Sequence, residues 1–172
     1  MATSLPTPIE FRLPEDWRPV PPDEVDATDT AFVALLPDPD RGFTANVTID
    51  GSHRPDTMSL TAMADRSVQT LRDALAGPDA VAVLNREEVG SADGPALTQT
   101  LRITTPVEGS DLDLLQSQVY LSMPGSVDPA RHAVIRLVFT ATAEQHRAAL
   151  PDFQWLVSTV RPDDGQSAPV RS

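Results

Sequence analysis

The sequence contains neither cysteine nor lysine, and these two absences exclude several kinds of chemistry. Without cysteine there can be no disulfide, no thiolate nucleophile and no cysteine-ligated zinc. Without lysine there can be no Schiff-base catalysis and no phosphate-binding lysine of a P-loop. All 13 basic residues are arginine. Together with 17 prolines, this bias indicates GC-rich codon usage and predicts an actinobacterial source.

Long hydrophobic runs are also missing. No apolar stretch approaches the roughly 18 residues that a membrane-spanning helix needs. Residues 1–10 lack the basic and apolar regions of a secretory signal peptide. We therefore expect a cytoplasmic protein that does not enter the membrane.

Positive charge is scarce, because 25 acidic residues outnumber the 13 basic ones and give a formal net charge of −12. A surface of this sign repels the phosphates of nucleic acids and of anionic lipids. The sequence thus predicts no nucleic-acid partner and no membrane partner. A basic protein partner stays open, as does the simpler reading that the charge only maintains solubility.

Motifs of catalysis and metal binding are absent. The sequence has no H-E-x-x-H, no G-x-S-x-G and no G-x-G-x-x-G pattern. His53 has Asp50 and Asp56 nearby in sequence, but a loop histidine of this kind is ordinarily solvated. A Ser/His/Asp triad stays open, since its members meet only in space. We expect no enzyme activity, no metal and no cofactor.

Hydrophobic periodicity predicts seven strands and two helices in one domain of ordinary size. Thr142 with Gln145 predicts a capping box at the start of the second helix, and Pro151 is expected to divide that helix. Gly77-Pro78 is expected to end the first helix. The predicted strands cover 9–13, 31–36, 43–50, 80–89, 96–105, 112–123 and 132–141, and the predicted helices cover 59–75 and 142–160.

The order of these elements is β-β-β-α-β-β-β-β-α. Four consecutive strands joined by short turns predict an antiparallel meander. Several strands are apolar on both faces, so helices are expected on both sides of the sheet. The prediction is an α+β fold, a single-domain three-layer α/β/α sandwich with a central antiparallel sheet. The domain covers 1–161, and 162–172 form a flexible C-terminal tail.

Three short stretches resemble a known superfamily. They are Leu-Pro-Glu-Asp-Trp at 13–17, Phe-Thr-Ala-Asn-Val at 43–47 and Gly-Pro-Ala at 94–96. With the strand order, roughly 8–161 resemble the superfamily of PsbP and the Ran-binding Mog proteins. The nearest members are the actinobacterial LpqN-type proteins and the Eag chaperones of type VI secretion. Unlike LpqN-type proteins, this sequence lacks an export signal and a lipobox cysteine.

The resemblance implies a domain that binds other proteins, since members bind photosystem subunits, a small GTPase or secreted effectors. We therefore expect a non-enzymatic protein-binding module, an adaptor or chaperone for another protein, including a secreted one. It would act as a monomer or a homodimer. The alternative is a small-molecule-binding domain or minor enzyme with a pocket between helix and sheet.

The candidate partner surface comes from the polar sides of the predicted strands. Amide and hydroxyl groups there can hydrogen-bond a peptide, and the single tyrosine can anchor it. The alternative is an ordinary solvated face in which threonine serves strand propensity. A second candidate is the acidic loop 15–29, for a basic partner. The residues predicted to bind a partner are Thr98, Thr100, Arg102, Gln116, Gln118 and Tyr120, with Thr44, Asn46 and Thr48 on a neighbouring strand.

Overall fold

The computed structural model describes residues 5, 9–25, 30–54, 59–75, 80–90, 95–107, 109–124 and 132–162. They form two helices and a large antiparallel sheet, which confirms the predicted α+β class. The helices are α1 (Leu60–Ala74) and α2 (Ala143–Thr159), with a short 3-10 helix at Pro22–Val25. The strands are β1 (Ile9–Glu10), β2 (Arg18–Val20), β3 (Phe32–Leu35), β4 (Asn46–Arg54), β5 (Val81–Gly90), β6 (Pro95–Val107), β7 (Ser110–Pro124), β8 (His132–Thr142) and β9 (Arg161–Pro162).

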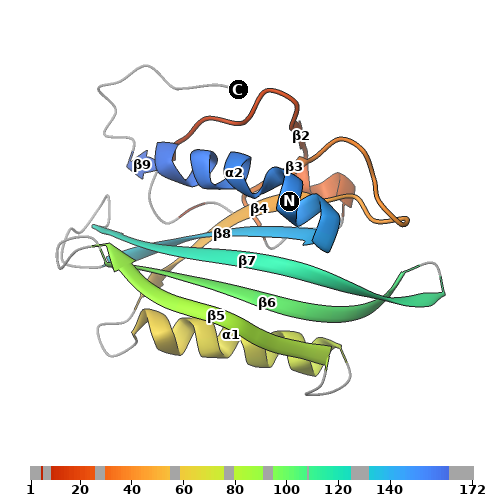
Figure 1. Cartoon of the computed structure of the whole chain (residues 1–172). Coiled ribbons are helices and arrows are strands. Elements are labelled where there is room, and N and C mark those ends of the chain that lie inside the picture. The colour runs from red at the N-terminus through yellow and green to blue at the C-terminus, as the bar shows by residue number, and fades with distance from the viewer. Residues whose placement is uncertain are drawn as a thin grey trace.

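The main sheet has seven strands in the order β2-β3-β4-β8-β7-β6-β5, and all neighbours are antiparallel. Strands β5 to β8 form the expected meander. Its tight β6–β7 turn contains Gly109, whose φ of 83° glycine adopts at no steric cost. The two helices lie on opposite sides of the sheet (Figure 1). Because α1 carries the chain from β4 to the far edge at β5, the meander returns and places β8 beside β4.

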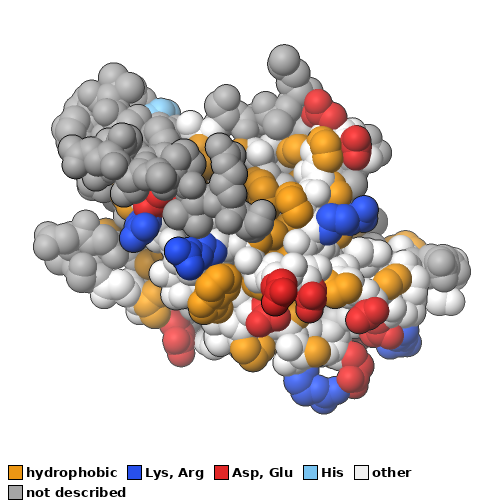
Figure 2. Space-filling model, turned by 90° about the horizontal axis from the view of Figure 1, so that it is seen from above, with side chains coloured by type: hydrophobic (Ala, Val, Ile, Leu, Met, Phe, Trp, Pro, Cys, Tyr) orange, Lys and Arg blue, Asp and Glu red, His pale blue; other side chains and the backbone are white. Residues whose placement is uncertain are grey.

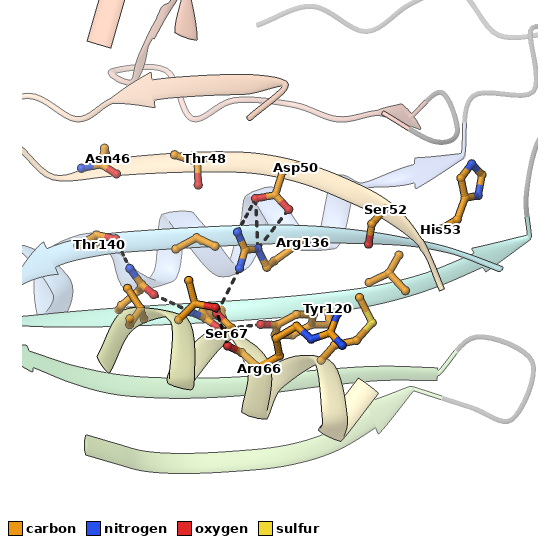
Figure 3. A pocket seen from close by; sticks show the side chains of 17 residues that line it. Asn46, Thr48, Asp50, Ser52, His53, Arg66, Ser67, Tyr120, Arg136 and Thr140 are labelled. Carbon is orange, nitrogen blue, oxygen red and sulfur yellow. Dashed lines mark hydrogen bonds and ion pairs between the residues drawn. The ribbon is translucent and has the colours of Figure 1, made fainter. Parts of the chain in front are cut away.

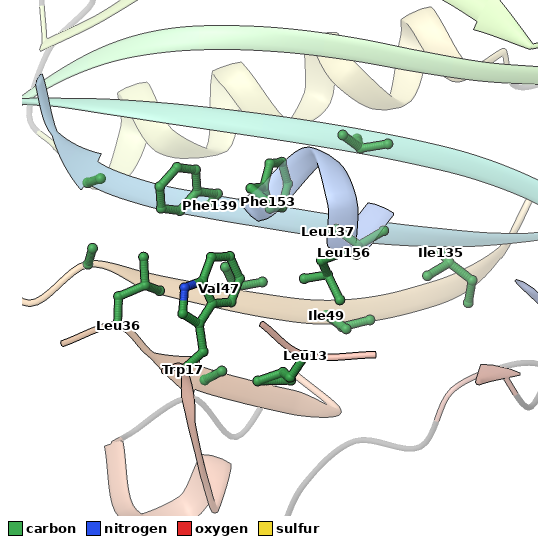
Figure 4. Packing of buried hydrophobic residues seen from close by; sticks show 14 of the residues in the cluster. Leu13, Trp17, Leu36, Val47, Ile49, Ile135, Leu137, Phe139, Phe153 and Leu156 are labelled. Atoms are coloured by element: carbon green, nitrogen blue, oxygen red, sulfur yellow. The ribbon is translucent and has the colours of Figure 1, made fainter. Parts of the chain in front are cut away.

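The largest hydrophobic cluster lies between α2 and the sheet (Figure 4). Phe139 of β8 is at its centre, with its ring centroid 5.2 Å from that of Phe153 and 6.3 Å from that of Trp17. Leu156 of α2 is buried in the same cluster, so the helix presents one apolar stripe to the sheet. Burial of Trp17 ties the segment before β2 to this core.

The capping box at the start of α2 is confirmed. The Thr142 hydroxyl accepts from the Gln145 backbone at 3.2 Å, and the Gln145 side chain accepts from the Thr142 backbone at 2.9 Å. The predicted division at Pro151 is wrong, because α2 runs through that residue. A proline removes one helical hydrogen bond. The burial of Phe153 and Leu156 just beyond it holds the helix to the sheet and offsets that loss.

Other boundaries differ from the predictions at the edges of the fold. Strands β2 and β9 were not predicted, β1 is shorter than expected, and β4 begins three residues late at Asn46. Such short strands carry too few residues to show an alternation. The predicted helix stop at Gly77-Pro78 lies outside the described residues, as does the predicted tail except for Pro162, which belongs to β9. Among the described helices, none is long and apolar enough to cross a bilayer.

Candidate functional site

Helix α1 covers only part of its side of the sheet. The Ser59 side chain caps its N-terminus by accepting from the Ala62 backbone at 3.0 Å. The buried face of the helix packs on β5, β6 and β7: Val68 meets Val81 and Leu101, and other buried residues of α1 cluster with Leu97 and Tyr120. On β8, the buried Val134 joins the cluster of Leu60 and Ala64, so α1 reaches across the sheet as far as this strand.

A groove of about 710 Å³ lies between α1 and strands β4, β8 and β7 (Figure 3). This volume is within the range of roughly 300–1,000 Å³ found for ligand sites. Most of its lining side chains end in hydroxyl or amide groups. The lining residues are Asn46, Thr48, Asp50, Ser52 and His53 of β4; Met63, Arg66, Ser67, Thr70 and Leu71 of α1; Gln116, Gln118 and Tyr120 of β7; and Val134, Arg136, Val138 and Thr140 of β8.

Hydrogen-bonded side-chain amides cross the sheet beneath this groove. Gln99 and Gln118 are register partners on β6 and β7, and the Gln99 amide donates to Gln118 at 2.7 Å. The Tyr120 hydroxyl donates to the same Gln118 oxygen at 2.8 Å. Gln118 donates to Gln116 at 2.6 Å, which in turn donates to Thr140 of β8 at 3.0 Å. Because buried polar groups satisfy one another here, the network fixes the floor in one arrangement.

An ion pair forms the wall of the groove on β4 and β8. Asp50 and Arg136 are register partners, and their closest oxygen and nitrogen are 2.7 Å apart. Arg136 also donates to the Ser67 hydroxyl of α1 at 3.2 Å. Burial lowers the pKa of Arg136, but the interactions with Asp50 and Tyr120 outweigh it and raise that pKa above the ordinary value. Arg136 is thus a permanently charged tie between sheet and helix.

The predicted partner surface is divided between the two faces of the sheet. Thr98 and Thr100 are register partners of Val119 and Ser117, so they share a face with those residues. The next positions on β7, Gln116, Gln118 and Tyr120, point to the opposite face and line the groove with Asn46 and Thr48. Thr98, Thr100 and Arg102 of β6 lie on the α2 side. Their role in partner binding stays a prediction.

The alternation within each strand can be recognised in the sequence. Which residues of two neighbouring strands share a face of the sheet depends on the register between those strands. Gln99, for which the sequence analysis made no prediction, is a buried polar residue between Leu97 and Leu101 in the sequence of β6. Gln118 and Tyr120 are each only 1% exposed. They therefore support the groove from below and cannot act as exposed anchors.

The groove residues missed by the sequence reasoning come from α1 and from the ion pair. Three polar residues of α1 border its apolar stripe: Arg66, Ser67 and Thr70. In a sequence, polar residues beside an apolar stripe cannot be told from ordinary solvent-exposed positions. Asp50 and Arg136 are 86 positions apart and meet only through the β4–β8 pairing. A charged residue within each predicted strand was the available signal.

On the other side of the sheet, a serine and a histidine form a buried pair. The Ser117 hydroxyl is 2.8 Å from Nε2 of His146, whose ring stacks on Phe139 at 5.3 Å. Both residues are buried, so a substrate would have no access to the serine. On this side, acidic and basic side chains are interspersed among hydrophobic ones (Figure 2).

Burial of His146 makes the stability of the protein dependent on pH. Burial lowers the pKa of His146, whereas the unfolded chain titrates near 6.5. The unfolded state then takes up the proton first, so this stability is complete above about pH 6.5 and is lost as the pH falls below it. Urea unfolding between pH 7.5 and 5.5 should show this decline, at a slope of at most about 1.4 kcal/mol per pH unit.

His146→Gln supplies the control for this prediction. Glutamine at position 146 cannot titrate, so the unfolding free energy of this variant should change less between pH 7.5 and 5.5. Most carboxylates begin to protonate only below this interval. Parallel curves for the two proteins would show that His146 is not the group responsible.

No group of three or more potential metal ligands occurs within the described ranges of the chain. His53 is exposed at the rim of the groove, and Asp56, which the sequence placed near it, lies outside those ranges.

Several solved structures have a similar fold. The cyanobacterial PsbP (CyanoP) of Synechocystis sp. PCC 6803 matches with a TM-score of 0.59 and 17% identity, covering 90% of this chain and 86% of its own. LpqN, involved in cell envelope biogenesis of Mycobacterium tuberculosis, matches with a TM-score of 0.58 and 12% identity, covering 93% and 87%. PA94 of Pseudomonas aeruginosa, a protein of unknown function, matches with a TM-score of 0.56 and 16% identity, covering 76% and 81%.

The predicted likeness to PsbP and LpqN is confirmed at the level of the fold, and identities this low establish the fold alone. The links to Mog proteins and Eag chaperones stay predictions. No protein-family model matches the sequence, and no curated protein matches it.

Proposed function

We propose that this protein is a non-enzymatic protein-binding module, a cytoplasmic adaptor or chaperone that holds a segment of another protein in the groove between α1 and the sheet. The groove itself carries the proposal, because its volume is that of a ligand site. Its hydroxyl and amide groups can also hydrogen-bond the backbone of a bound segment. The PsbP-like fold is compatible with an accessory role, as in LpqN, whose structure is described as that of a protein involved in cell envelope biogenesis.

The chemistry of the groove favours binding over catalysis. A general acid or base must be free to exchange a proton with a substrate. Asp50, the carboxylate that lines the groove, is held by Arg136, and the glutamines of the floor are hydrogen-bonded to one another. The histidine of the lining, His53, is exposed at the rim and lies outside this network. These groups can present fixed donors and acceptors to a ligand, which is what recognition requires.

The shape of the groove favours an extended polypeptide. Asn46, Thr48, Asp50 and Ser52 are alternate residues of β4, so they recur about every 7 Å along one wall. They span about 20 Å, the length of roughly six extended residues. An extended chain presents its own side chains with the same repeat, so its alternate residues can meet those of β4.

A small molecule is the second candidate for the groove, because a volume of about 710 Å³ also suits a compact ligand. A saturating ligand would stabilise the protein by roughly 2.7 kcal/mol at a hundred times its dissociation constant. A thermal-shift screen of metabolites would detect this, and a stabilising metabolite that displaces no protein partner would favour this candidate.

Substitution of Thr70 tests whether the groove holds a protein. Thr70 is an exposed residue of α1 that lines the groove, so Thr70→Trp fills the site without disturbing the core. We expect the tagged wild-type protein to capture one dominant partner from its native cytosol, and Thr70→Trp to retain at least about tenfold less, a loss of about 1.4 kcal/mol. Quantitative mass spectrometry measures both.

Gln69→Trp is the matched control. Gln69 is the neighbouring exposed residue of the same helix, but it faces β5 with Val83 and Arg86 and does not line the groove. This variant should capture the partner as the wild type does. Equal capture by all three proteins would show that the partner binds elsewhere, and equal loss in both variants would show that α1 itself had been disturbed.

A further inference from the structure

The charge of the groove is opposite in sign to that of the whole chain. Arg66 and Arg136 line it with one carboxylate, Asp50, so these side chains sum to +1, while the chain carries −12. Most acidic residues therefore lie elsewhere. A local potential of this kind selects ligands of the opposite sign at short range.

Of the two arginines, only Arg66 is available to a ligand. Arg136 is held by Asp50 at 2.7 Å and donates to Ser67. Arg66 is exposed, lines the groove, and makes no ion pair with a carboxylate in the described part of the chain. Figure 3 shows its side chain extending from α1 beside Tyr120.

The carboxylate next to Arg66 in the sequence is directed away from it. Asp65 pairs with Arg86 of β5 at 2.6 Å, on the side of α1 remote from β4. Successive helix residues point about 100° apart, which separates the two side chains. Arg66 thus faces the groove without a neighbour on its own helix to neutralise it.

We propose that the groove binds an extended polypeptide segment that carries an acidic side chain, and that Arg66 pairs with that carboxylate. This inference rests on the proposed function. An arginine guanidinium matches a carboxylate through two parallel hydrogen bonds, so it selects both charge and orientation. The Asn46 amide nitrogen already donates to the Thr44 carbonyl, and the Thr140 oxygen accepts from Gln116. The Thr48 hydroxyl, the Asn46 side-chain oxygen and the Thr140 hydroxyl proton can still hydrogen-bond the uncharged remainder of the segment.

Three fluorescein-labelled decapeptides of glycine and threonine, differing only in a central Glu-Glu, Gln-Gln or Arg-Arg pair, provide the probes. Fluorescence anisotropy at low ionic strength gives their dissociation constants. The wild type should bind the Glu-Glu peptide at least about tenfold more tightly than the Gln-Gln peptide. The net charge of the protein repels an acidic peptide, so this preference requires a local cation. It should weaken at high salt, which screens exposed charges.

Arg66→Glu should reverse the preference toward the Arg-Arg peptide, and Arg66→Gln should remove it without reversing it. Arg102→Glu is the matched control, because it makes the same change of charge at an exposed residue on the opposite face of the sheet. This control should keep the preference for the Glu-Glu peptide. The peptides that bind should all lose affinity in Thr70→Trp.

The outcomes separate the inference from the proposed function. Equal binding of Glu-Glu and Gln-Gln peptides, or a preference unchanged in Arg66→Glu, overturns the role of Arg66; if Thr70→Trp still weakens binding, the groove remains a peptide site. Failure of all three peptides to bind, or binding that Thr70→Trp does not affect, overturns the proposed function and the inference with it.

Discussion

Phe139→Ala should lower the free energy of unfolding by about 3–5 kcal/mol, the usual cost of removing a buried aromatic side chain. Phe139 is fully buried and contacts the rings of Trp17, His146 and Phe153. Its loss leaves a cavity where α2, β8 and the N-terminal segment meet. Close-packed neighbours collapse only partly into such a space, so the cavity adds to the lost burial.

Phe11→Ala is the matched control for Phe139→Ala. Phe11 lies at the margin of the same cluster, is only partly buried, and contacts the ring of Phe32 edge-on at 5.0 Å. Its removal should cost about 1–2 kcal/mol, because less apolar area is lost. Urea unfolding of both variants gives the comparison. A cost for Phe139→Ala no greater than for Phe11→Ala would show that Phe139 is not the centre of the core.

Gln118→Leu should lower the unfolding free energy by about 2–4 kcal/mol. The substitution keeps the volume but removes the acceptor of Gln99 and Tyr120 and the donor to Gln116. Each buried group left without a partner costs about 1–3 kcal/mol, and some recover partners by moving. Equilibrium unfolding of the variant measures the loss.

Two further variants test whether the network is responsible. Adding Gln99→Leu removes a second member of the network. The double variant should therefore lose less unfolding free energy than the two single variants lose in sum. Thr98→Leu, at a half-buried position on the opposite face of β6, should change the unfolding free energy by only about 0.5 kcal/mol. Simple additivity at Gln99 and Gln118 would contradict a shared network.

The burial of Gln118 and Tyr120 also affects how a binding experiment must be designed. Substituting either by alanine was the natural test of the surface predicted from the sequence. Because both support the floor, such variants would lose structure together with any binding. Thr70 and Arg66 are the better positions, since they are exposed on α1 and line the same groove.

Local patterns predicted the parts of the fold in which one face is buried and the other is not. The alternation of 132–141 and 112–123 became β8 and β7, and the Thr142–Gln145 capping box set the start of α2. Pro151 was misjudged because propensity was weighed without the packing of the residues beyond it. Tertiary contacts routinely override such preferences.

The groove could not be predicted from the sequence, because it depends on where α1 rests across the sheet. That position is set by contacts such as Val68 with Leu101 and Leu60 with Tyr120, which join distant segments. Likewise, the register between strands determines which polar residues of neighbouring strands lie on the same face of the sheet. Thr98 and Gln118 lie on different faces although each follows the polar alternation of its own strand.

The pairing of β4 with β8 has a consequence for synthesis on the ribosome. Strands β5 to β8 pair with their neighbours in sequence, so this meander needs only short loops to close. Strand β4 is made before all of them, yet its partner residues begin at His132. Until that point is synthesised, β4 can pair with β3 along one edge, but its other edge has no strand to join. Contacts so distant in sequence form slowly. The free edge of β4 must therefore stay unpaired in the nascent chain until β8 has been made.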